Sequence, residues 1–449
     1  MTTPIAAIVL AAGKGTRMKS DLHKVLHPIA GQPMLLHLLA SLDTAGAARK
    51  VVVVGAGREQ VEAAVIGRAD IAVQAEQLGT AHAALMARDA LAGFDGIVLV
   101  CFGDTPFLSA DTVARLVARL ESADAPRVAV LGFTPDDPQA YGRILTGAGD
   151  SVTRMVEYKD ATDAERAVRL CNSGVTAVRA ADLWPLLDRV GNANAAGEYY
   201  LPDVVMLALA DGDAAVVVET HADEVIGINS RGELANAEAR WQHARRDRAM
   251  ADGATLIAPE TVWFAHDTVV GRDVMIEPNV CFGPGVTIAD GAMIRAFSHV
   301  EGATIGEGAE VGPYARLRPG AVLGARSKVG NFVEVKKATL GVGAKANHLS
   351  YIGDADVGAG ANIGAGTITC NYDGFFKYRT SIGEGAFIGS NSALVAPVAI
   401  GAGAIVAAGS VVTRDVEADA LALARGKQEA RAGWAARFRA MMAARKSGQ

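Results

Sequence analysis

The stretch that decides the fold of the N-terminal half is Leu10-Ala11-Ala12-Gly13-Lys14-Gly15-Thr16-Arg17-Met18. It follows directly on the apolar run 5–9, so a short buried strand should lead into a glycine-rich, cationic loop. Glycines without a Cβ allow backbone N–H groups to approach a ligand closely, and Lys14 and Arg17 add positive charge. Such a loop suits a polyphosphate. It is neither a Walker loop nor a Rossmann fingerprint, since Met18 stands where the latter requires a third glycine.

The totals limit the class of protein. At 449 residues the chain should form two or three domains, and its balance of 50% apolar and 20% charged residues is typical of globular proteins. The net charge of −6 gives no reason to expect nucleic-acid binding. We expect no signal peptide and no membrane span. Four widely spaced cysteines, without a CxxC pair, predict free thiols in a reducing cytoplasm: Cys101, Cys171, Cys281 and Cys370.

Residues 1–228 alternate strand and helix patterns, which predicts βαβ units and a mostly parallel sheet. In such sheets, ligands bind beyond the carboxyl ends of the strands. Both the Leu10–Met18 loop and Gly103-Asp104 are expected at such ends, and Asp104 is a natural Mg²⁺ ligand there. The expected strands are 51–54 and 97–101, and the expected helices are 34–42, 80–91 and 109–120.

Residues 229–250 predict one connecting helix. Ser230 and Glu233 form a possible capping box at its start. Three arginines near its end, Arg245, Arg246 and Arg248, are interpreted as a solvated face and not as a binding patch.

From about residue 255 to 415 the sequence repeats with a period of six, in which an aliphatic residue precedes glycine. Three hexads make one triangular coil, the aliphatic residue points inward, and stacked coils bury these side chains together at roughly 4.8 Å spacing. Matches include Ile305-Gly306, Val311-Gly312, Leu323-Gly324, Val329-Gly330, Ile352-Gly353, Val357-Gly358, Ile363-Gly364, Ile382-Gly383, Ile388-Gly389 and Ile400-Gly401.

Two features interrupt this repeat. The segment 371–378, with four aromatic residues and a lysine, cannot fit a coil corner and should loop outward. His348 stands beside polar residues inside an otherwise aliphatic repeat, so it is a candidate general base. In the tail, residues 434–446 predict an amphipathic helix that packs on the β-helix or on a neighbouring subunit.

The N-terminal string, together with Leu22-His23-Lys24-Val25-Leu26, resembles the sugar-phosphate nucleotidylyltransferases. This resemblance implies that Arg17 and Lys24 are catalytic and that Asp104 and Asn229 hold Mg²⁺. Phe102 stands where a tyrosine is expected, a change that should leave the chemistry intact. The resemblance implies binding of UTP or UDP-N-acetylglucosamine by Leu10, Ala11, Ala12, Gly13, Lys24, Gln74, Gly79, Thr80, Phe102, Gly103, Gly142, Glu157, Asn172 and Asn229.

The hexapeptide region resembles the left-handed β-helix of hexapeptide acyltransferases, and the match of the whole chain, from Leu10 to Trp434, is to bifunctional N-acetylglucosamine-1-phosphate uridyltransferase/glucosamine-1-phosphate N-acetyltransferases. That resemblance implies that His348 is the base and that the family forms homotrimers through the β-helix. It implies binding of the amino sugar phosphate by Arg318, Lys336, Tyr351 and Asn362. It implies binding of acetyl-CoA by Ala365, Asn371, Tyr372, Ser390, Ala408 and Arg425.

The sequence therefore predicts a Rossmann-like uridyltransferase domain at 1–228, a linker helix at 229–250, and a β-helical acetyltransferase domain with a helical tail at 251–449. Acetyl-CoA would acetylate glucosamine 1-phosphate, and UTP would then convert the product to UDP-N-acetylglucosamine for the cell envelope. One alternative retains the nucleotidyl transfer alone and makes the β-helix an oligomerisation scaffold. Another is a non-enzymatic nucleotide sensor, which the presence of Arg17, Lys24 and Asp104 disfavours.

Overall fold

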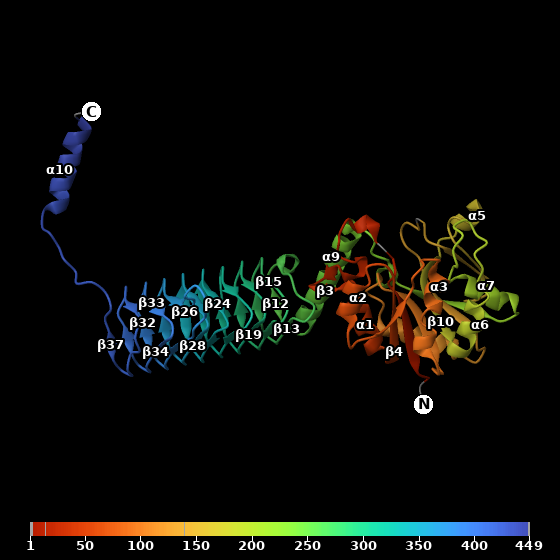
Figure 1. The fold of residues 1–449 in the computed structure, drawn as a ribbon, viewed down its shortest axis with the longest axis horizontal. Helices are drawn as coiled ribbons and strands as arrows, with labels where there is room; N and C mark the ends of the chain where they lie inside the picture. Colours follow the sequence, from red (N-terminus) through yellow and green to blue (C-terminus); the bar gives the residue numbers. More distant parts are fainter. Residues whose placement is uncertain (1–2, 14, 139, 448–449) are drawn as a thin grey trace. The chain divides into compact units, whose positions relative to one another are not determined.

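The computed structural model describes residues 3–13, 15–138 and 140–447, and divides the chain into two compact units, Met1–Trp241 and Gln242–Gln449 (Figure 1). The boundary falls inside helix α9 (Arg231–Ala251). Each unit has its own architecture.

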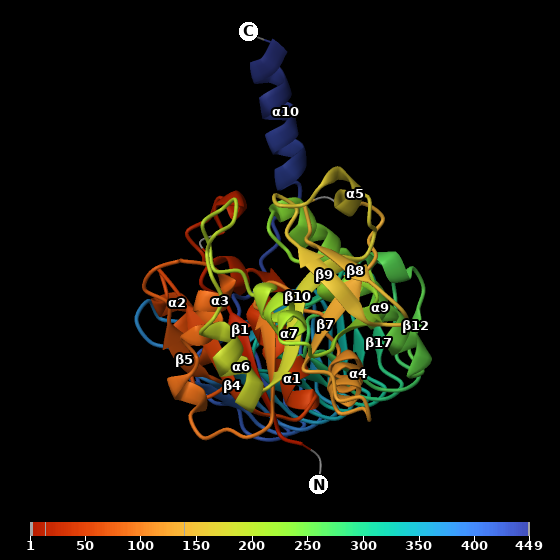
Figure 2. The ribbon, with the colours of Figure 1, turned by 90° about the vertical axis from the view of Figure 1, so that its right-hand side faces the viewer.

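The first unit is built on a nine-stranded sheet in the order β11-β7-β10-β6-β1-β4-β5, with β8 and β9 attached beside β10 (Figure 2). β1 pairs in parallel with both β4 and β6, and β4 pairs in parallel with β5. The strands are β1 (Ile5–Leu10), β4 (Ala47–Val54), β5 (Asp70–Val73), β6 (Ile97–Phe102), β7 (Val128–Phe133), β8 (Arg143–Thr146), β9 (Val152–Val156), β10 (Cys171–Arg179) and β11 (Ala215–Thr220), with a small separate pair, β2 (Pro28–Ile29) and β3 (Gln32–Pro33).

Helices cover both faces of this sheet, because successive strand residues point to opposite faces. Ala6, Ile8 and Leu10 pack with helices α3, α6 and α7, whereas Ala7 and Val9 pack with α1, α2 and α4. The helices of the unit are α1 (Met34–Thr44), α2 (Glu59–Val65), α3 (Thr80–Leu85), α4 (Ala110–Leu120), α5 (Asp163–Arg166), α6 (Ala180–Leu187), α7 (Asp203–Ala210) and α8 (Ala222–Val225), with 3-10 turns η1 (Thr16–Met18), η2 (Lys24–Leu26) and η3 (Asp89–Leu91).

The predicted α/β class is confirmed, with two local differences. β10 runs antiparallel to both β6 and β7, and the β8–β9 hairpin is antiparallel as well. The connections there contain only the four-residue helix α5, which is too short for a parallel crossover. The helix expected at 80–91 is α-helical only to Leu85 and ends in the 3-10 turn η3.

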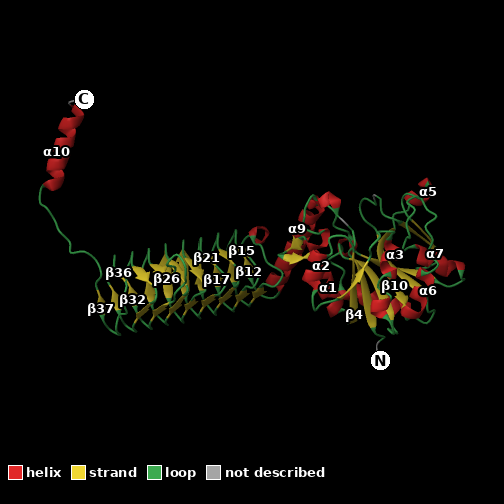
Figure 3. Cartoon of the chain, in the orientation of Figure 1, coloured by secondary structure: helices red, strands yellow, loops and turns green. Residues whose placement is uncertain are grey.

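The second unit is a β-helix whose short strands form three parallel sheets (Figure 3). This is the arrangement expected of the left-handed hexapeptide fold, and the inward aliphatic residues at the predicted positions, such as Ile305, Val329 and Ile388, are fully buried.

The first sheet contains β12 (Thr255–Leu256), β14 (Met275–Ile276), β17 (Met293–Ile294), β20 (Glu310–Val311), β23 (Lys328–Asn331), β26 (Lys345–His348), β29 (Asn362–Ile363), β32 (Phe387–Ile388), β35 (Ile405–Val406) and β37 (Leu421–Ala422). The second contains β15 (Cys281–Phe282), β18 (His299–Val300), β21 (Arg316–Leu317), β24 (Glu334–Lys336), β27 (Tyr351–Gly353), β30 (Ile368–Cys370), β33 (Ala393–Val395) and β36 (Val411–Val412). The third contains β13 (Val269–Val270), β16 (Thr287–Ile288), β19 (Ala303–Ile305), β22 (Ala321–Leu323), β25 (Thr339–Leu340), β28 (Ala355–Val357), β31 (Thr380–Ile382) and β34 (Val398–Ile400), and a 3-10 turn η4 (Pro259–Thr261) lies near the start of the unit.

Helix α9 begins as predicted, because Ser230 Oγ accepts from Glu233 N at 3.3 Å and Glu233 Oε2 accepts from Ser230 N at 3.1 Å. The interpretation of its arginines as a solvated face is wrong for two of them. Arg245 donates to the Thr268 carbonyl at 2.8 Å and lies over the Phe264 ring, and Arg246 donates to the Val262 carbonyl at 3.2 Å. These cations hydrogen-bond to backbone carbonyls of the first coil, which would otherwise lack partners at that end of the β-helix.

The tail forms helix α10 (Trp434–Ser447), as predicted, but none of its described residues is buried. In the single chain the described residues of this helix are exposed, and its expected packing on the β-helix or on a neighbouring subunit stays a prediction. The described part of the chain also contains no helix that is long and apolar enough to span a bilayer.

Alternation along strand β22 gives a test of the β-helix core. Leu323→Ala removes a side chain that is 1% exposed, whereas Val322→Ala alters its outward-facing neighbour, which is 40% exposed. We expect Leu323→Ala to lower the free energy of unfolding by about 2–5 kcal/mol, since it leaves a cavity. Val322→Ala should cost under about 1 kcal/mol. Denaturant unfolding of the two full-length variants measures this, and equal losses would contradict the assigned inward register.

Candidate active sites

The predicted phosphate loop lies where strand order reverses in the first sheet. β1 and β6 are neighbours, Leu10 is paired with Phe102, and Gly103 N donates to the Leu10 carbonyl at 3.0 Å. The loops after both strands thus meet at one edge, which is the place where ligands bind in open α/β sheets.

The two glycines of this loop have different roles. Gly15 has a φ of +58°, and a Cβ there would lie 2.4 Å from Lys24 Cβ, so Gly15 is needed for the turn and for close packing on Lys24. Gly13 faces open space, as expected for backbone that a ligand approaches. Lys14, the other cation predicted for this loop, lies outside the described residues.

Lys24, Asp104 and Asn229 converge. The Lys24 ammonium forms an ion pair with Asp104 Oδ2 and donates to Asn229 Oδ1 at 3.0 Å. A hydrogen bond from Ile228 N to the Asp104 carbonyl, at 3.0 Å, joins the segment that carries Asn229 to the one that carries Asp104. In addition, Glu233 Oε2 accepts from Asn229 N at 2.5 Å. The capping residue of α9 therefore also fixes the backbone of Asn229.

This convergence fits a divalent cation. One carboxylate oxygen and one amide oxygen already point to a single positive charge, that of Lys24, and hard oxygen donors are what Mg²⁺ prefers. Within the described ranges, no three His, Cys, Asp or Glu side chains cluster as a metal site. A metal here would thus take few protein ligands and the rest from phosphate and water, which is usual for Mg²⁺.

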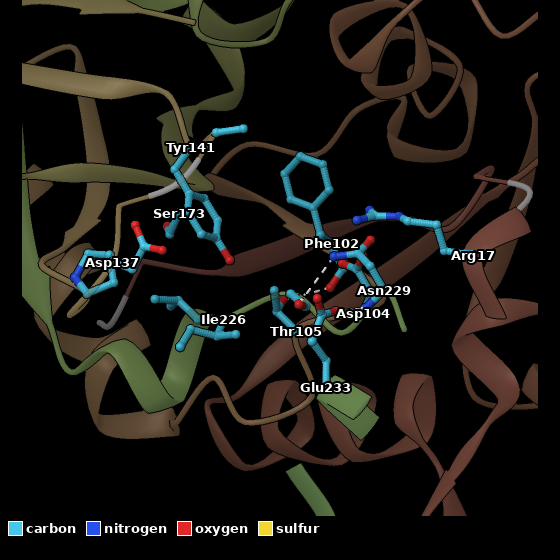
Figure 4. Close-up of a pocket in the computed structure, with 14 residues that line it drawn as sticks. Arg17, Phe102, Asp104, Thr105, Asp137, Tyr141, Ser173, Ile226, Asn229 and Glu233 are labelled. Atoms are coloured by element: carbon cyan, nitrogen blue, oxygen red, sulfur yellow. Dashed lines mark hydrogen bonds between the residues drawn. The ribbon is translucent and has the colours of Figure 1, made fainter. Parts of the chain in front are cut away.

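Two cavities meet at Asp104 and Phe102. One, of about 410 Å³, is lined by Arg17, Asp104, Tyr141 and Asn229 among others, and Arg17 enters it from the side opposite Tyr141 (Figure 4). The second, of about 310 Å³, is lined by Leu10, Ala11, Ala12, Gly13, Lys24, Gln74, Gly79 and Thr80. Arg17 and Lys24, predicted for catalysis, therefore line two neighbouring cavities that share Phe102 and Asp104, and most of the residues predicted for the nucleotide line the second of them.

Gln74 is 3% exposed, so it is not a solvent-facing side chain. Its Nε2 lies 3.0 Å from both the Gly79 carbonyl and His82 Nδ1. Because the nitrogen makes these contacts, we expect Oε1 to accept a hydrogen bond from a ring N–H of a base. Gly79 itself packs against the backbone of Tyr199, where a Cβ would lie 2.4 Å from the Tyr199 carbonyl oxygen.

The predicted sugar-side residues share a third cavity, of about 280 Å³, which Gly142, Glu157, Asn172 and Phe102 line. Asn172 N donates to the Gly142 carbonyl at 2.9 Å, and Asn172 Oδ1 accepts from Gly174 N at 2.8 Å. Desolvation on burial, followed by the charges of Asp160, Asp203 and Glu198, raises the pKa of Glu157 above its usual value. A carboxylate that is buried beside other negative charges lacks hydrogen-bond donors, so it is well suited to accept hydrogen bonds from sugar hydroxyls.

In the β-helix, His348 lies at the end of β26, and its Nδ1 is 2.6 Å from Asn331 Oδ1 of the coil below. Both residues line a cavity of about 610 Å³ on the face of the first sheet. Sequence reasoning missed Asn331. The available signal was its position in the repeat, which is equivalent to that of His348 one coil earlier.

Most of the residues predicted for acetyl-CoA form a single column at the corner after the first sheet. The backbone rungs run from Leu349 N to the Asn331 carbonyl, Gly366 N to His348, Asn391 N to Ala365, and Gly409 N to Ser390. Arg425 Nη1 then donates to the Ala408 carbonyl at 2.7 Å. This column, which we call the corner ladder, contains Asn331, His348, Ala365, Ser390, Ala408 and, at its end, Arg425.

The residues predicted for the amino sugar phosphate separate into two groups. Arg318 donates to Glu334 at 2.8 Å, and the pKa of Lys336 is lowered, above all by its contact with Lys377 and also by Arg318. Tyr351 lies close enough to Arg318 to interact with it electrostatically. Asn362, by contrast, is paired with Lys345 on the face of the first sheet. Lys377 was not predicted individually, because it lies in the inserted loop.

The segment 371–378 loops outward as predicted. Phe375 is 86% exposed, Tyr372 pairs with Lys377 across the loop, and Tyr378 N donates to the Asn371 carbonyl at 2.9 Å. Asn371 is buried and donates through Nδ2 to Asp354, so it fixes the base of the loop, while the Tyr372 hydroxyl donates to the Gly374 carbonyl within it.

Comparison with known proteins agrees with this division. Residues 7–167 match the family model of the MobA-like NTP transferase domain. Residues 267–302 and 302–337 match the bacterial transferase hexapeptide model, and residues 379–414 match the hexapeptide repeat of succinyl-transferase. A protein of Rhizorhabdus wittichii named bifunctional protein GlmU is 69% identical over 99% of this chain and 98% of its own length. Proteins of the same name from Sphingopyxis alaskensis and Zymomonas mobilis are 66% and 58% identical, over 100% and 97% of this chain and 99% and 98% of their own lengths.

The raised pKa of Glu157 predicts a stabilising substitution. A carboxyl whose pKa is higher in the folded state stabilises the fold below its unfolded pKa and loses that contribution as pH rises through the folded pKa. Glu157→Gln should therefore raise the melting temperature at pH 7, with a gain that shrinks as the pH falls toward about 4. Thermal unfolding over this pH range measures the effect.

Glu165→Gln is the matched control with the opposite sign. Hydrogen bonds from the Thr162 backbone and hydroxyl, and then from Arg154, lower the pKa of Glu165. The contribution of Glu165 to stability is present above its unfolded pKa and is lost as the pH falls through its folded pKa. Glu165→Gln should therefore lower the melting temperature at pH 7. A loss of stability for Glu157→Gln at pH 7 would contradict the assigned environment.

Proposed function

The chain belongs to the family of bifunctional GlmU proteins, and on that premise we propose that its two units carry separate reactions on one pathway. The second unit transfers acetyl from acetyl-CoA to glucosamine 1-phosphate. The first unit then joins N-acetylglucosamine 1-phosphate to UTP and releases pyrophosphate. The observation that carries the proposal is that each unit has its own set of reactive side chains, Arg17, Lys24 and Asp104 in one and His348 in the other.

We assign uridylyl transfer to residues 1–228, acetyl transfer to 251–449, and a linker to 229–250. Free cysteines at positions 101, 171, 281 and 370 agree with a reducing compartment, and we place both reactions in the cytoplasm. The homotrimer is proposed through the β-helix. Exposed α10 and the separation of Asn362 from Arg318 and Lys336 support an acetyl site that draws on neighbouring subunits.

In the first unit, an oxygen of the sugar phosphate attacks the α-phosphorus of UTP in line and pyrophosphate leaves. A phosphate is already a nucleophile, so the protein has to position the groups and neutralise charge. Gly13 N–H and the Lys24 ammonium face the triphosphate in one cavity, and Arg17 lines the neighbouring cavity, which shares Asp104 with the first. Asp104 and Asn229 would hold Mg²⁺, which supplies further neutralisation of phosphate charge when bound.

In the uridyl site, specificity arises beside this centre. Gln74 and the 77–80 segment face the base, and Gly142, Glu157 and Asn172 face the sugar. Phe102 lies between the base and sugar cavities and packs on Gly174, where a Cβ would be 2.4 Å from the ring. A tyrosine hydroxyl at this position is not needed for that packing, in accord with the expectation that phenylalanine preserves the chemistry.

In the second unit, the amine of glucosamine 1-phosphate attacks the thioester carbonyl carbon. As the carbon–nitrogen bond forms, His348 Nε2 removes a proton from the attacking nitrogen. The carbon–sulfur bond then breaks, and the proton passes from the imidazolium to the departing thiolate. The Ala365 N–H is proposed to donate to the carbonyl oxygen as negative charge develops. Arg318 and Lys336, with Lys377, hold the phosphate, and Asn371, Tyr372, Ser390, Ala408 and Arg425 line the path of acetyl-CoA.

A split assay on the purified protein with Mg²⁺ tests the proposal. One reaction contains glucosamine 1-phosphate and acetyl-CoA and is followed by free thiol. The other contains N-acetylglucosamine 1-phosphate and UTP and is followed by pyrophosphate. Product in both supports two active sites, whereas pyrophosphate without thiol would make the β-helix a scaffold and remove the catalytic role of His348.

His348→Ala should lower acetyl transfer by roughly 10²–10⁴-fold, the usual contribution of a general base, and leave uridylyl transfer near its original rate. Both activities are measured in the split assay on the same preparation. If both fell together while the fold remained intact, the assignment of separate sites would be wrong.

Asp104→Asn gives the reciprocal result. It removes the carboxylate charge at the proposed metal site, so uridylyl transfer should fall by about 10²–10³-fold, with a higher Mg²⁺ requirement. Acetyl transfer in the same sample serves as the control and should be unchanged. Unaltered uridylyl transfer and Mg²⁺ dependence would show that Asp104 holds no metal.

A further inference from the structure

We propose that Asn331 is the positioning residue of the acetyl-transfer site: its side-chain oxygen fixes the tautomer and direction of the His348 ring. The proposal rests on the proposed role of His348 as base. Its basis is the contact of 2.6 Å between His348 Nδ1 and Asn331 Oδ1.

The β-helix register fixes the backbones of this pair. Asn331 and His348 are paired in strands β23 and β26, and Leu349 N donates to the Asn331 carbonyl at 3.0 Å. The preceding residue is Gly330, where a Cβ would lie 2.0 Å from the Asn347 carbonyl oxygen. Only glycine allows the coils to stack so closely here, so the side chains of the following positions, Asn331 and His348, meet.

The chemistry of the contact determines which ring nitrogen is the base. An amide oxygen only accepts hydrogen bonds, so the His348 nitrogen that faces it must carry a proton. With Nδ1 protonated, the neutral ring has its lone pair on Nε2, and that is the atom left to accept a proton from substrate. Asn331 also contacts the imidazolium that forms, without placing a negative charge beside it.

The cavity beside this pair contains both signs of charge. Arg295 pairs with Glu277 at 3.2 Å and with Glu310, and Lys328 pairs with Glu310 at 3.0 Å. The groups that face the His348 side of the first sheet are Glu277, Arg295, Glu310, Lys328 and Lys345, and they come from the coils below His348 as well as from its own strand. Since the carboxylates are paired with cations, the neutral Asn331 is the direct acceptor for Nδ1.

Two substitutions separate the acceptor role from a merely structural one. Asn331→Ala removes the acceptor and should lower kcat for acetyl transfer roughly 10- to 100-fold, the range seen when a histidine ligand loses its orienting partner. Asn331→Asp retains an acceptor but adds a charge, so the acid limb of the pH–rate profile should move up by at least about one unit. Above that shifted limb, Asn331→Asp should recover most of the original rate, which Asn331→Ala should not do at any pH.

Uridylyl transfer by the same samples controls for folding, and the double variant His348→Ala/Asn331→Ala controls for the route of the effect. If Asn331 acts through His348, its removal should have no further effect in the His348→Ala background. A normal rate and pH profile for Asn331→Ala, an unmoved acid limb for Asn331→Asp, or an additive effect in the double variant would overturn the proposal. If His348→Ala alone retained acetyl transfer, the role of His348 as base would fail instead, and the two failures are therefore distinguishable.

Discussion

The second unit depends on one constraint: every coil must bury its aliphatic side chains against the coil below it. Parallel backbone hydrogen bonds keep neighbouring coils at one strand spacing, and the residues between the inward positions are repeated in outward columns. The corner ladder is such a column. His348 sits in it between Asn331 below and Ala365 above, so the same stacking that stabilises the core also sets the distances between reactive groups.

In the first unit, the reactive side chains are positioned in a different way. Its site forms where β1 and β6 end side by side, and segments distant in sequence are joined there by single hydrogen bonds, as between Ile228 and Asp104. Lys24 lies between the side-chain oxygens of Asp104 and Asn229. Its positive charge neutralises the Asp104 carboxylate before any ligand binds. That compensation matters, because an isolated carboxylate in a half-buried site is costly.

Periodicity and motif spacing predicted most of the fold, since inward aliphatic positions and strand-to-loop transitions are local properties of the sequence. The residues that were missed depend on contacts between separate segments. The role of Asn331 depends on the stacking of its coil against that of His348. The role of Lys377 depends on the folding of its loop back toward Lys336. Arg245 and Arg246 were misinterpreted because the carbonyls they bind belong to a coil further along the chain. The burial of Gln74 likewise arises from its partners Gly79 and His82.

The inserted loop 371–378 leaves and re-enters the β-helix at one corner, where the Asn371 carbonyl accepts from Tyr378 N, and the next strand resumes its register on the coil below. The insertion therefore imposes no repacking on the core. A scaffold of this kind separates the residues that must be kept for folding from those that are free to vary with the ligand. New recognition elements can be gained or lost at its corners in single steps, and the evolutionary cost of such a change is confined to the loop itself.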